Sequence, residues 1–128
     1  AEWEKAARGT DGRKYPWGNE DATCDNAVIG GCPGDAMDVC SKSPAGDSPY
    51  GLCDMAGNVW ECVSDWYASD YYSNSPTSNP TGPVSGSDRV RRGGSFRNGY
   101  GAHRASSRLY DTPSYDYVNR GFRCSRSQ

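Results

Sequence analysis

Histidines and closely spaced cysteine pairs, the usual ligands of a structural zinc ion, are nearly missing from this sequence. The 128 residues include a single histidine, His103, and no C-x-x-C motif. Because structural zinc sites take four Cys or His ligands, often in closely spaced pairs, this pattern excludes a zinc finger or zinc ribbon. A lone histidine among many serines is also poor evidence for a catalytic triad, so we interpret His103 as a packed or surface residue.

Long apolar stretches are absent as well. No segment approaches the roughly 20 consecutive apolar residues of a membrane span, so we predict none. Phenylalanine occurs only twice, whereas the chain has four tryptophans and nine tyrosines. The mean hydropathy of −0.89 would suit a disordered chain. The aromatic residues and six cysteines instead predict a folded domain whose core is built largely from Tyr and Trp and held by turns and crosslinks.

The net charge is only −2, but the two signs are separated along the chain. Residues 1–88 hold 5 basic and 14 acidic residues, a net charge of −9, and residues 89–128 hold 9 arginines and 2 aspartates, a net charge of +7. A basic half can mark a nucleic-acid surface. Opposed halves of one domain also pair with each other when they pack, and we predict no nucleic-acid partner.

The even number of cysteines at this density fits a disulfide framework formed in an oxidising compartment. We therefore expect a secreted, periplasmic or cell-surface protein. The residues alone do not choose among the possible pairings. The six cysteines are Cys24, Cys32, Cys40, Cys53, Cys62 and Cys124.

The length and patterning predict a single α+β domain over residues 1–128, with short strands and little helix. Residues 1–9, AEWEKAARG, are typical of a helix that ends at Gly9. Because no N-cap residue precedes this helix, we expect an N-terminal portion of the domain to be missing. Strand-like composition marks 58–67, 89–95 and 117–125, whereas turn residues predict long loops at 10–50 and 73–88.

Five blocks in this sequence follow one another as they do in the formylglycine-generating-enzyme family, also called sulfatase-modifying-factor domains. These blocks are AEWEKAARG, KYPWGNE, SPYGLCDMAGNVWECVSDWY, RVRRGGSF and NRGFRC. The chain resembles this family from residue 1 to about residue 124. The resemblance implies a variant of the C-type-lectin fold, which is irregular and loop-rich and binds calcium. Family members usually have a substantial segment before AEWE.

The block CDMAGNVWEC places two carboxylates around a tight Gly-Asn turn. The resemblance implies that this segment binds calcium through Asp54, Gly57, Val59 and Glu61. Calcium takes six to eight hard oxygen ligands and mixes carboxylates with backbone carbonyls. Asp54 and Glu61 would give carboxylate oxygens, and Gly57 and Val59 would give carbonyl oxygens. The alternative is an ordinary turn with two solvated acids.

The resemblance also bears on catalysis. Catalytic members bind copper through two cysteines that follow the GGS block, and they oxidise a substrate cysteine with oxygen. A thiolate pair is what copper(I) prefers. Here no cysteine occurs from residue 63 to residue 123, and the first catalytic position falls near Asn98. We predict no catalytic residue; the alternative is a formylglycine-generating-type oxidoreductase, or an accessory part of one, with catalytic groups outside this chain.

The resemblance suggests one of the disulfides. Cys62 stands where relatives usually have tryptophan, and Cys124 lacks its usual family partner because Ala7 occupies that place. A Cys62–Cys124 bond is therefore predicted. The other four cysteines would then form two bridges.

A further branch of the family, the variable proteins of diversity-generating retroelements, presents a changeable ligand-binding face between RGGS and GFR. Mutation of asparagine codons at adenines cannot produce Lys, Glu, Gln, Met or Trp, and residues 97–123 contain none of these five types. Tyrosines with Ser, Gly and Asn also match the chemistry of antibody paratopes. The predicted ligand-binding residues are Arg97, Asn98, Tyr100, Ala102, Leu109, Tyr110, Asp111, Tyr115, Tyr117 and Asn119.

The sequence therefore predicts a non-catalytic, lectin-like domain that is stabilised by calcium and disulfides and binds a ligand through residues 97–119. The expected ligand is a protein, with a glycan as the alternative. Two other interpretations of the segment stay open. Its tyrosines could form the core of a domain that is short of aliphatic residues, and ordinary non-catalytic family members can have a similar composition.

Overall fold

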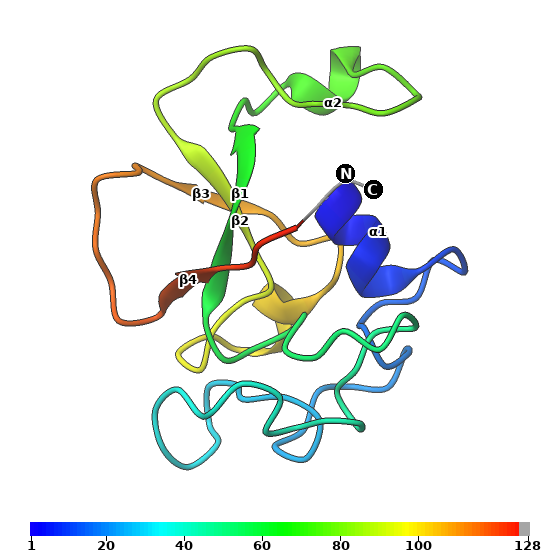
Figure 1. The fold of residues 1–128 in the computed structure, drawn as a ribbon, viewed down its shortest axis with the longest axis vertical. Coiled ribbons are helices and arrows are strands. Elements are labelled where there is room, and N and C mark those ends of the chain that lie inside the picture. The colour runs from blue at the N-terminus through cyan, green and yellow to red at the C-terminus, as the bar shows by residue number, and fades with distance from the viewer. Residues whose placement is uncertain (126–128) are drawn as a thin grey trace.

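The computed structural model describes residues 1–125 and is built around one small mixed sheet (Figure 1). The strand order is β3-β2-β1-β4. β1 pairs with β2 in antiparallel and with β4 in parallel orientation, and β2 pairs with β3 in antiparallel orientation. The strands are β1 (Trp60–Trp66), β2 (Arg89–Arg92), β3 (Leu109–Asp111) and β4 (Arg120–Phe122). The predicted α+β class with short strands and much loop is confirmed.

Within residues 1–125, helical structure is limited to three short elements, α1 (Glu2–Arg8), α2 (Tyr71–Asn74) and the 3-10 helix η1 (Tyr100–His103). α1 ends at Gly9 as predicted, and the φ of 67° there is a conformation that glycine adopts at little cost. Its buried face brings Ala7 against Met55 and Ala105, and Trp3 packs on the same cluster. This helix therefore closes one side of the domain core.

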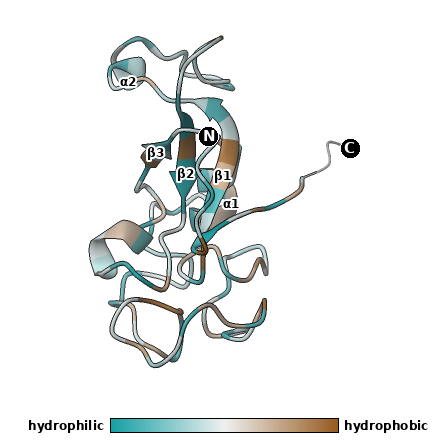
Figure 2. Cartoon of the chain, turned by 90° about the vertical axis from the view of Figure 1, so that its left-hand side faces the viewer, coloured by the Kyte–Doolittle hydropathy of each residue, from teal (hydrophilic) through white to brown (hydrophobic). Residues whose placement is uncertain are grey.

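The predicted loop region between α1 and β1 is confirmed, since residues 10–50 form only turns and one isolated bridge. It occupies the lower part of the molecule in Figure 1. A small core of Ala22, Ala27 and Ile29 lies inside it. Figure 2 shows hydrophobic colour in the middle of the strands and only in short stretches of these loops. The loop region thus combines a small apolar core with crosslinks and hydrogen bonds.

Two disulfides, Cys24–Cys32 and Cys40–Cys53, crosslink the loop region. The prediction of a Cys62–Cys124 bond was wrong, because both residues carry free thiols. The register of the parallel β1–β4 pair explains the error. Cys62 lies opposite Phe122, so Cys124 lies two positions further along, roughly 6–7 Å away along the strand direction. A disulfide needs partners that face each other with closely spaced Cα atoms.

Two strand predictions need correction. The C-terminal strand begins at Arg120 rather than at residue 117, because the Arg120 N–H donates to the Tyr117 carbonyl at 3.1 Å and closes a turn. β3 was not anticipated. Two of its three residues are exposed, so it lacks the alternation of apolar and polar residues that marks a half-buried strand.

Candidate ligand-binding face

The predicted binding segment lies largely on the surface. Six of its ten predicted residues are exposed, and the other four are half-buried. Tyr100 is 57% exposed, and Tyr110, the least exposed of the four tyrosines, is still 48% exposed. The exposed six are Arg97, Tyr100, Leu109, Tyr110, Tyr115 and Tyr117. The alternative that the tyrosines form the core is wrong, because the large buried side chains include Trp60, Tyr15 and Met55 instead.

A buried serine connects the two ends of this segment. Ser95 is fully buried, and its hydroxyl donates to Asn98 Oδ1 at 2.6 Å. The same hydroxyl oxygen accepts from Asn119 Nδ2 at 3.1 Å. The Asn119 carbonyl in turn accepts from the Trp60 N–H at 2.8 Å, at the start of β1. Asn98 and Asn119 therefore hold the segment on the sheet and are positioning residues.

Asp111 is also positioned by internal contacts. Its carboxylate lies 2.7 Å from Arg91 Nη1 and 2.7 Å from Arg120 Nη2. Neither Asp111 Oδ2 nor Arg120 Nη2 has a hydrogen-bond partner among the described residues, so these contacts are ion pairs. Because the three residues lie on β3, β2 and β4, one carboxylate connects both edge strands to the inner part of the sheet. Its predicted contact with a ligand is therefore secondary to this structural role.

The exposed aromatic rings are held in fixed orientations by their neighbours. Tyr110 stacks on Tyr67 with the ring centroids 4.0 Å apart. The Arg108 guanidinium lies over the Tyr67 ring and, at 4.1 Å, over the Tyr72 ring. Tyr115 and Tyr117 form an edge-to-face pair. Rings that are held in this way offer contact area at a low entropic cost on binding.

A hollow of about 400 Å³ opens between β4 and the turn that precedes it. Arg89 and Arg120 lie in its walls, and Cys62 and Phe122 line it as well. Phe122 is 79% exposed, the most exposed large aromatic side chain of the sheet. This hollow has the size for one or two side chains of a partner, and no pattern in the sequence predicted it.

His103 is fully buried beneath the segment, as the interpretation of a packed residue requires. Its Nε2 lies 3.1 Å from the Ser95 carbonyl oxygen and its Nδ1 lies 3.0 Å from the Gly99 carbonyl oxygen. Burial lowers the pKa of His103, and the hydrogen bonds to backbone groups oppose that shift in part. The ring connects the two ends of the turn that carries Arg97 and Asn98, and it does not face solvent.

The predicted calcium segment is a strained turn. Asp54, Gly57 and Asn58 have φ angles of 55°, 87° and 62°. At Gly57 a Cβ atom would lie 2.6 Å from the Val28 carbonyl oxygen, so only glycine fits. Among the hydrogen bonds of residues 1–125, none ends on the carbonyl oxygen of Gly57 or Val59. These two oxygens are therefore available to a cation.

The two carboxylates of the calcium segment differ in their surroundings. Asp54 Oδ2 accepts from the Cys40 N–H at 2.7 Å, and its other oxygen is available. Glu61 is 6% exposed and accepts from Trp3 Nε1 at 2.6 Å and from Arg123 Nη2 at 2.7 Å. Asp54 therefore keeps one carboxylate oxygen that accepts no hydrogen bond from the described residues, whereas both oxygens of Glu61 are already used by Arg123 and Trp3.

Comparison with known families places these features in context. The family model of the sulfatase-modifying factor enzyme 1-like domain matches residues 1–128. The chain belongs to this family. It is 38% identical to the formylglycine-generating enzyme of Streptomyces coelicolor, with 98% of this chain covering 44% of that protein. The chain therefore spans less than half the length of that relative.

Two further proteins are similar to this formylglycine-generating-enzyme-like domain. The inactive C-alpha-formylglycine-generating enzyme 2 of Mus musculus is 38% identical over 98% of this chain and 41% of that protein. Among solved structures, Treponema denticola variable protein 1 matches with a TM-score of 0.75 and 33% identity. That match covers 94% of this chain and 43% of the other.

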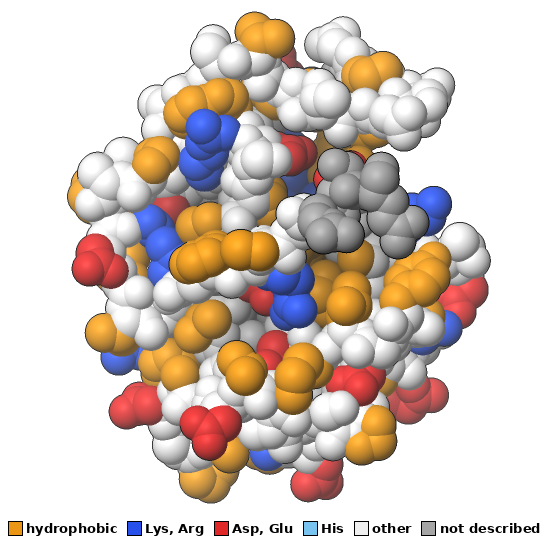
Figure 3. Space-filling view, in the orientation of Figure 1, with side chains coloured by type: hydrophobic (Ala, Val, Ile, Leu, Met, Phe, Trp, Pro, Cys, Tyr) orange, Lys and Arg blue, Asp and Glu red, His pale blue; other side chains and the backbone are white. Residues whose placement is uncertain are grey.

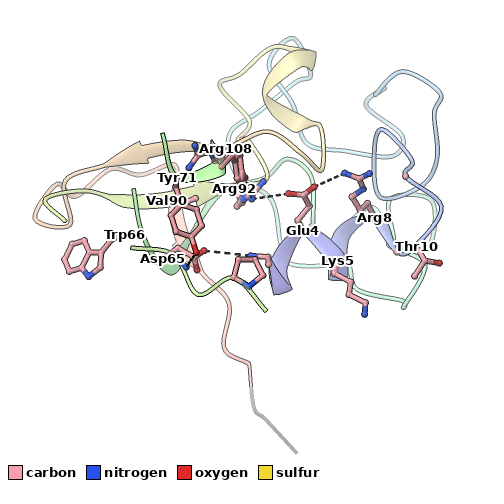
Figure 4. A pocket seen from close by; sticks show the side chains of 16 residues that line it. Glu4, Lys5, Arg8, Thr10, Asp65, Trp66, Tyr71, Val90, Arg92 and Arg108 are labelled. Atoms are coloured by element: carbon pink, nitrogen blue, oxygen red, sulfur yellow. Dashed lines mark hydrogen bonds and ion pairs between the residues drawn. The ribbon is translucent and has the colours of Figure 1, made fainter. Parts of the chain in front are cut away.

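A second hollow of the domain, about 440 Å³ in volume, lies beside α1 (Figure 4). Glu4 on its wall is already paired with Arg8 at 2.8 Å and with Arg92 at 3.2 Å. Tyr71 and Trp66 supply aromatic surface. The described residues that line it include neither cysteine nor histidine, so it lacks the thiolate or imidazole of the commonest nucleophilic and metal-binding sites.

The two disulfides, which both crosslink the loop region, fit folding in an oxidising compartment. Among residues 1–125, none of the helices has the length and apolar character that a bilayer crossing requires.

Proposed function

We propose that this chain is a non-catalytic ligand-binding domain and that the segment 97–119 forms its binding face. The observation that carries the proposal is the contrast within that segment. Its four tyrosines and Arg97 are exposed, whereas His103 within it and Ser95, which is hydrogen-bonded to Asn98 and Asn119, are fully buried. Side chains on the outside can therefore be exchanged while the hydrogen-bonded support stays unchanged.

The proposal includes diversification of this face by a retroelement. Two observations support it. None of the five residue types that adenine mutation of asparagine codons cannot produce occurs in residues 97–123. A solved relative at 33% identity is named a variable protein. The expected partner is a protein, because a surface with several exposed tyrosines suits protein epitopes. A glycan is the second class. The expected location is secreted, periplasmic or cell-surface, where disulfides persist.

Population sequencing tests this proposal. The gene segment for residues 89–128 would be read from many cells of one source population. We expect substitutions to concentrate at the predicted ligand-binding positions of the segment, with Arg104, Pro113 and the residues of GFR unchanged. A single invariant sequence would refute diversification.

Calcium is proposed as a stabilising ion bound by Asp54 and the carbonyl oxygens of Gly57 and Val59, with Glu61 as the fourth ligand. A ligand that binds only the folded state at 100 times its Kd adds about 2.7 kcal/mol of stability. We expect the melting temperature to rise in calcium chloride relative to EDTA. Asp54→Asn should remove this rise, and Asp25→Asn, which removes an exposed charge elsewhere, should keep it. Equal melting temperatures with and without calcium would contradict the assignment.

The rival function is that of a formylglycine-generating oxidoreductase or an accessory part of one, and the 38% identity to the Streptomyces coelicolor enzyme favours it. The two proposals separate in one assay. The protein is incubated with copper, oxygen and a cysteine-containing peptide, and the peptide mass is followed. We expect no oxidation of the peptide cysteine, because the segment after GGS has no thiol to bind copper(I). Conversion of that cysteine would overturn the binding proposal.

A further inference from the structure

The loop 35–39, DAMDV, is an exposed apolar surface outside the segment discussed so far. Every residue from Pro33 to Cys40 is exposed. Val39 is 81% exposed and Met37 is 44% exposed. Two acids, Asp35 and Asp38, lie beside them in the sequence. The ion pairs of the described residues include neither of these acids. An apolar surface bordered by polar residues is typical of interaction sites.

This loop is rigidly held although it is exposed. The side-chain amide of Asn58 donates to the Met37 carbonyl and accepts from the Met37 N–H, both at 3.0 Å. Disulfides close the chain on both sides, through Cys32 and Cys40. A loop that is fixed before binding loses less conformational entropy in a complex.

The same residue that holds the loop also contacts the start of the binding segment. The Asn58 carbonyl accepts from the Phe96 N–H at 2.9 Å. The Gly30 N–H donates to the Asn98 carbonyl at 2.8 Å, and a Cβ atom at Gly30 would lie 2.8 Å from that oxygen. In the view of Figure 1 the loop (cyan) is drawn below the 96–99 turn (yellow). Asn58 thus links the loop to the start of the binding segment through its side chain and its backbone carbonyl.

We propose that the loop 35–39 is a constant part of the binding face and that it recognises a protein segment with an apolar side chain flanked by Lys or Arg. This inference rests on the proposed function of residues 97–119. Met37 and Val39 would contact the apolar side chain. The two aspartates would attract the flanking cations, which fits an acidic loop in a half of the chain with net charge −9. The segment 97–119 would then vary around a fixed anchor.

The test uses a phage-displayed library of random 12-residue peptides selected on the intact protein. We expect selected peptides to be enriched in an apolar residue next to Lys or Arg. Their Kd should rise at least tenfold for Met37→Ser/Val39→Ser and should rise, in a salt-dependent manner, for Asp35→Asn/Asp38→Asn. Val84→Ser is the matched control, because Val84 is fully exposed in a distant loop, and it should leave the Kd unchanged.

A further variant, Arg97→Ser/Tyr100→Ser, separates this inference from the function on which it rests. Weaker binding for both the loop variant and this segment variant supports one shared face. Weaker binding for the segment variant alone overturns the inference and leaves the proposed function standing. Weaker binding for the loop variant alone contradicts the shared face and the proposed function together. A library that yields no binder also overturns the inference.

Discussion

At the scale of single residues, two asparagines with left-handed backbone conformations have very different surroundings. Asn58 has a φ of 62°, is 5% exposed and makes two side-chain hydrogen bonds to Met37. Asn79 has a φ of 47° and lies exposed in the long loop after α2. A comparison of the two asparagines therefore separates two contributions to stability, that of the backbone conformation and that of the side-chain hydrogen bonds.

We expect Asn58→Ala to lower the free energy of unfolding by about 2–4 kcal/mol, because it removes two buried hydrogen bonds as well as a residue suited to positive φ. Asn79→Ala should cost about 1–2 kcal/mol, the backbone contribution alone. Urea denaturation of both variants measures the difference. Equal losses would mean that the contacts with Met37 contribute nothing to stability.

His103 gives the domain a pH dependence with a defined sign. Burial lowers its pKa in the folded state, and the unfolded value is about 6.5. As the pH falls, the unfolded chain therefore binds a proton at His103 before the folded chain does. The contribution of His103 to the free energy of unfolding is fully present above about pH 6.5 and is lost as the pH falls toward the lower pKa of the folded state. We expect the urea concentration at the unfolding midpoint to be lower at pH 5 than at pH 7. His103→Gln should flatten that part of the profile; an unchanged slope would show that another group causes it.

At the scale of secondary-structure elements, the sequence predicted what depends on local pattern. α1 was predictable because Trp3 and Ala7 share a face and Gly9 ends the helix. β3 was not predictable from local pattern, because it is held by the ion pairs that its residue Asp111 makes with Arg91 and Arg120. These two arginines lie on other strands. The same limit applies to the free thiols, since the register of β4 against β1 decides which side chains face each other.

The same distinction between local pattern and long-range contact applies to the candidate site. The exposed tyrosines of 97–119 followed from composition and from the family resemblance. The loop at Met37 did not, because its position beside Phe96 depends on the side chain of Asn58. No local pattern in residues 31–40 indicates that contact.

The loop region between α1 and β1 depends on its crosslinks. The two disulfides join residues 8 and 13 positions apart, and loops of this size gain about 2–3 kcal/mol each from closure. We expect reduction to lower the melting temperature sharply. Cys62→Ser/Cys124→Ser should leave it nearly unchanged, and alkylation without reduction should label two thiols. Labelling of none would restore the Cys62–Cys124 bond.

At the scale of the whole molecule, the opposed charges of the two halves meet in specific ion pairs. Arg92 lies 3.2 Å from Glu4, and Arg123 lies 2.7 Å from Glu61. On the face in Figure 3, acidic side chains gather over the lower part, where the loop region lies. The basic half therefore provides β2, β3, β4 and the binding segment, and part of its charge is neutralised internally by the acidic half.

The central claim is that the exposed side chains of 97–119 can be exchanged without unfolding the domain, whereas the residues that support them cannot be exchanged. One comparison of unfolding free energies tests it most directly, between a fourfold surface variant and a single substitution in the support. The surface variant replaces Arg97, Tyr100, Tyr115 and Tyr117 by serine. The support variant is Asp111→Asn, which leaves Arg91 and Arg120 without their shared counter-ion.

We expect the fourfold variant to lose no more than about 2 kcal/mol, since exposed substitutions usually change stability by about 0.5 kcal/mol each. The single Asp111→Asn change should cost about 2 kcal/mol or more, because it leaves two largely buried guanidinium groups unpaired. A fourfold variant that unfolds, or that loses much more than the single change, would show that the tyrosines hold the domain together and would contradict the account.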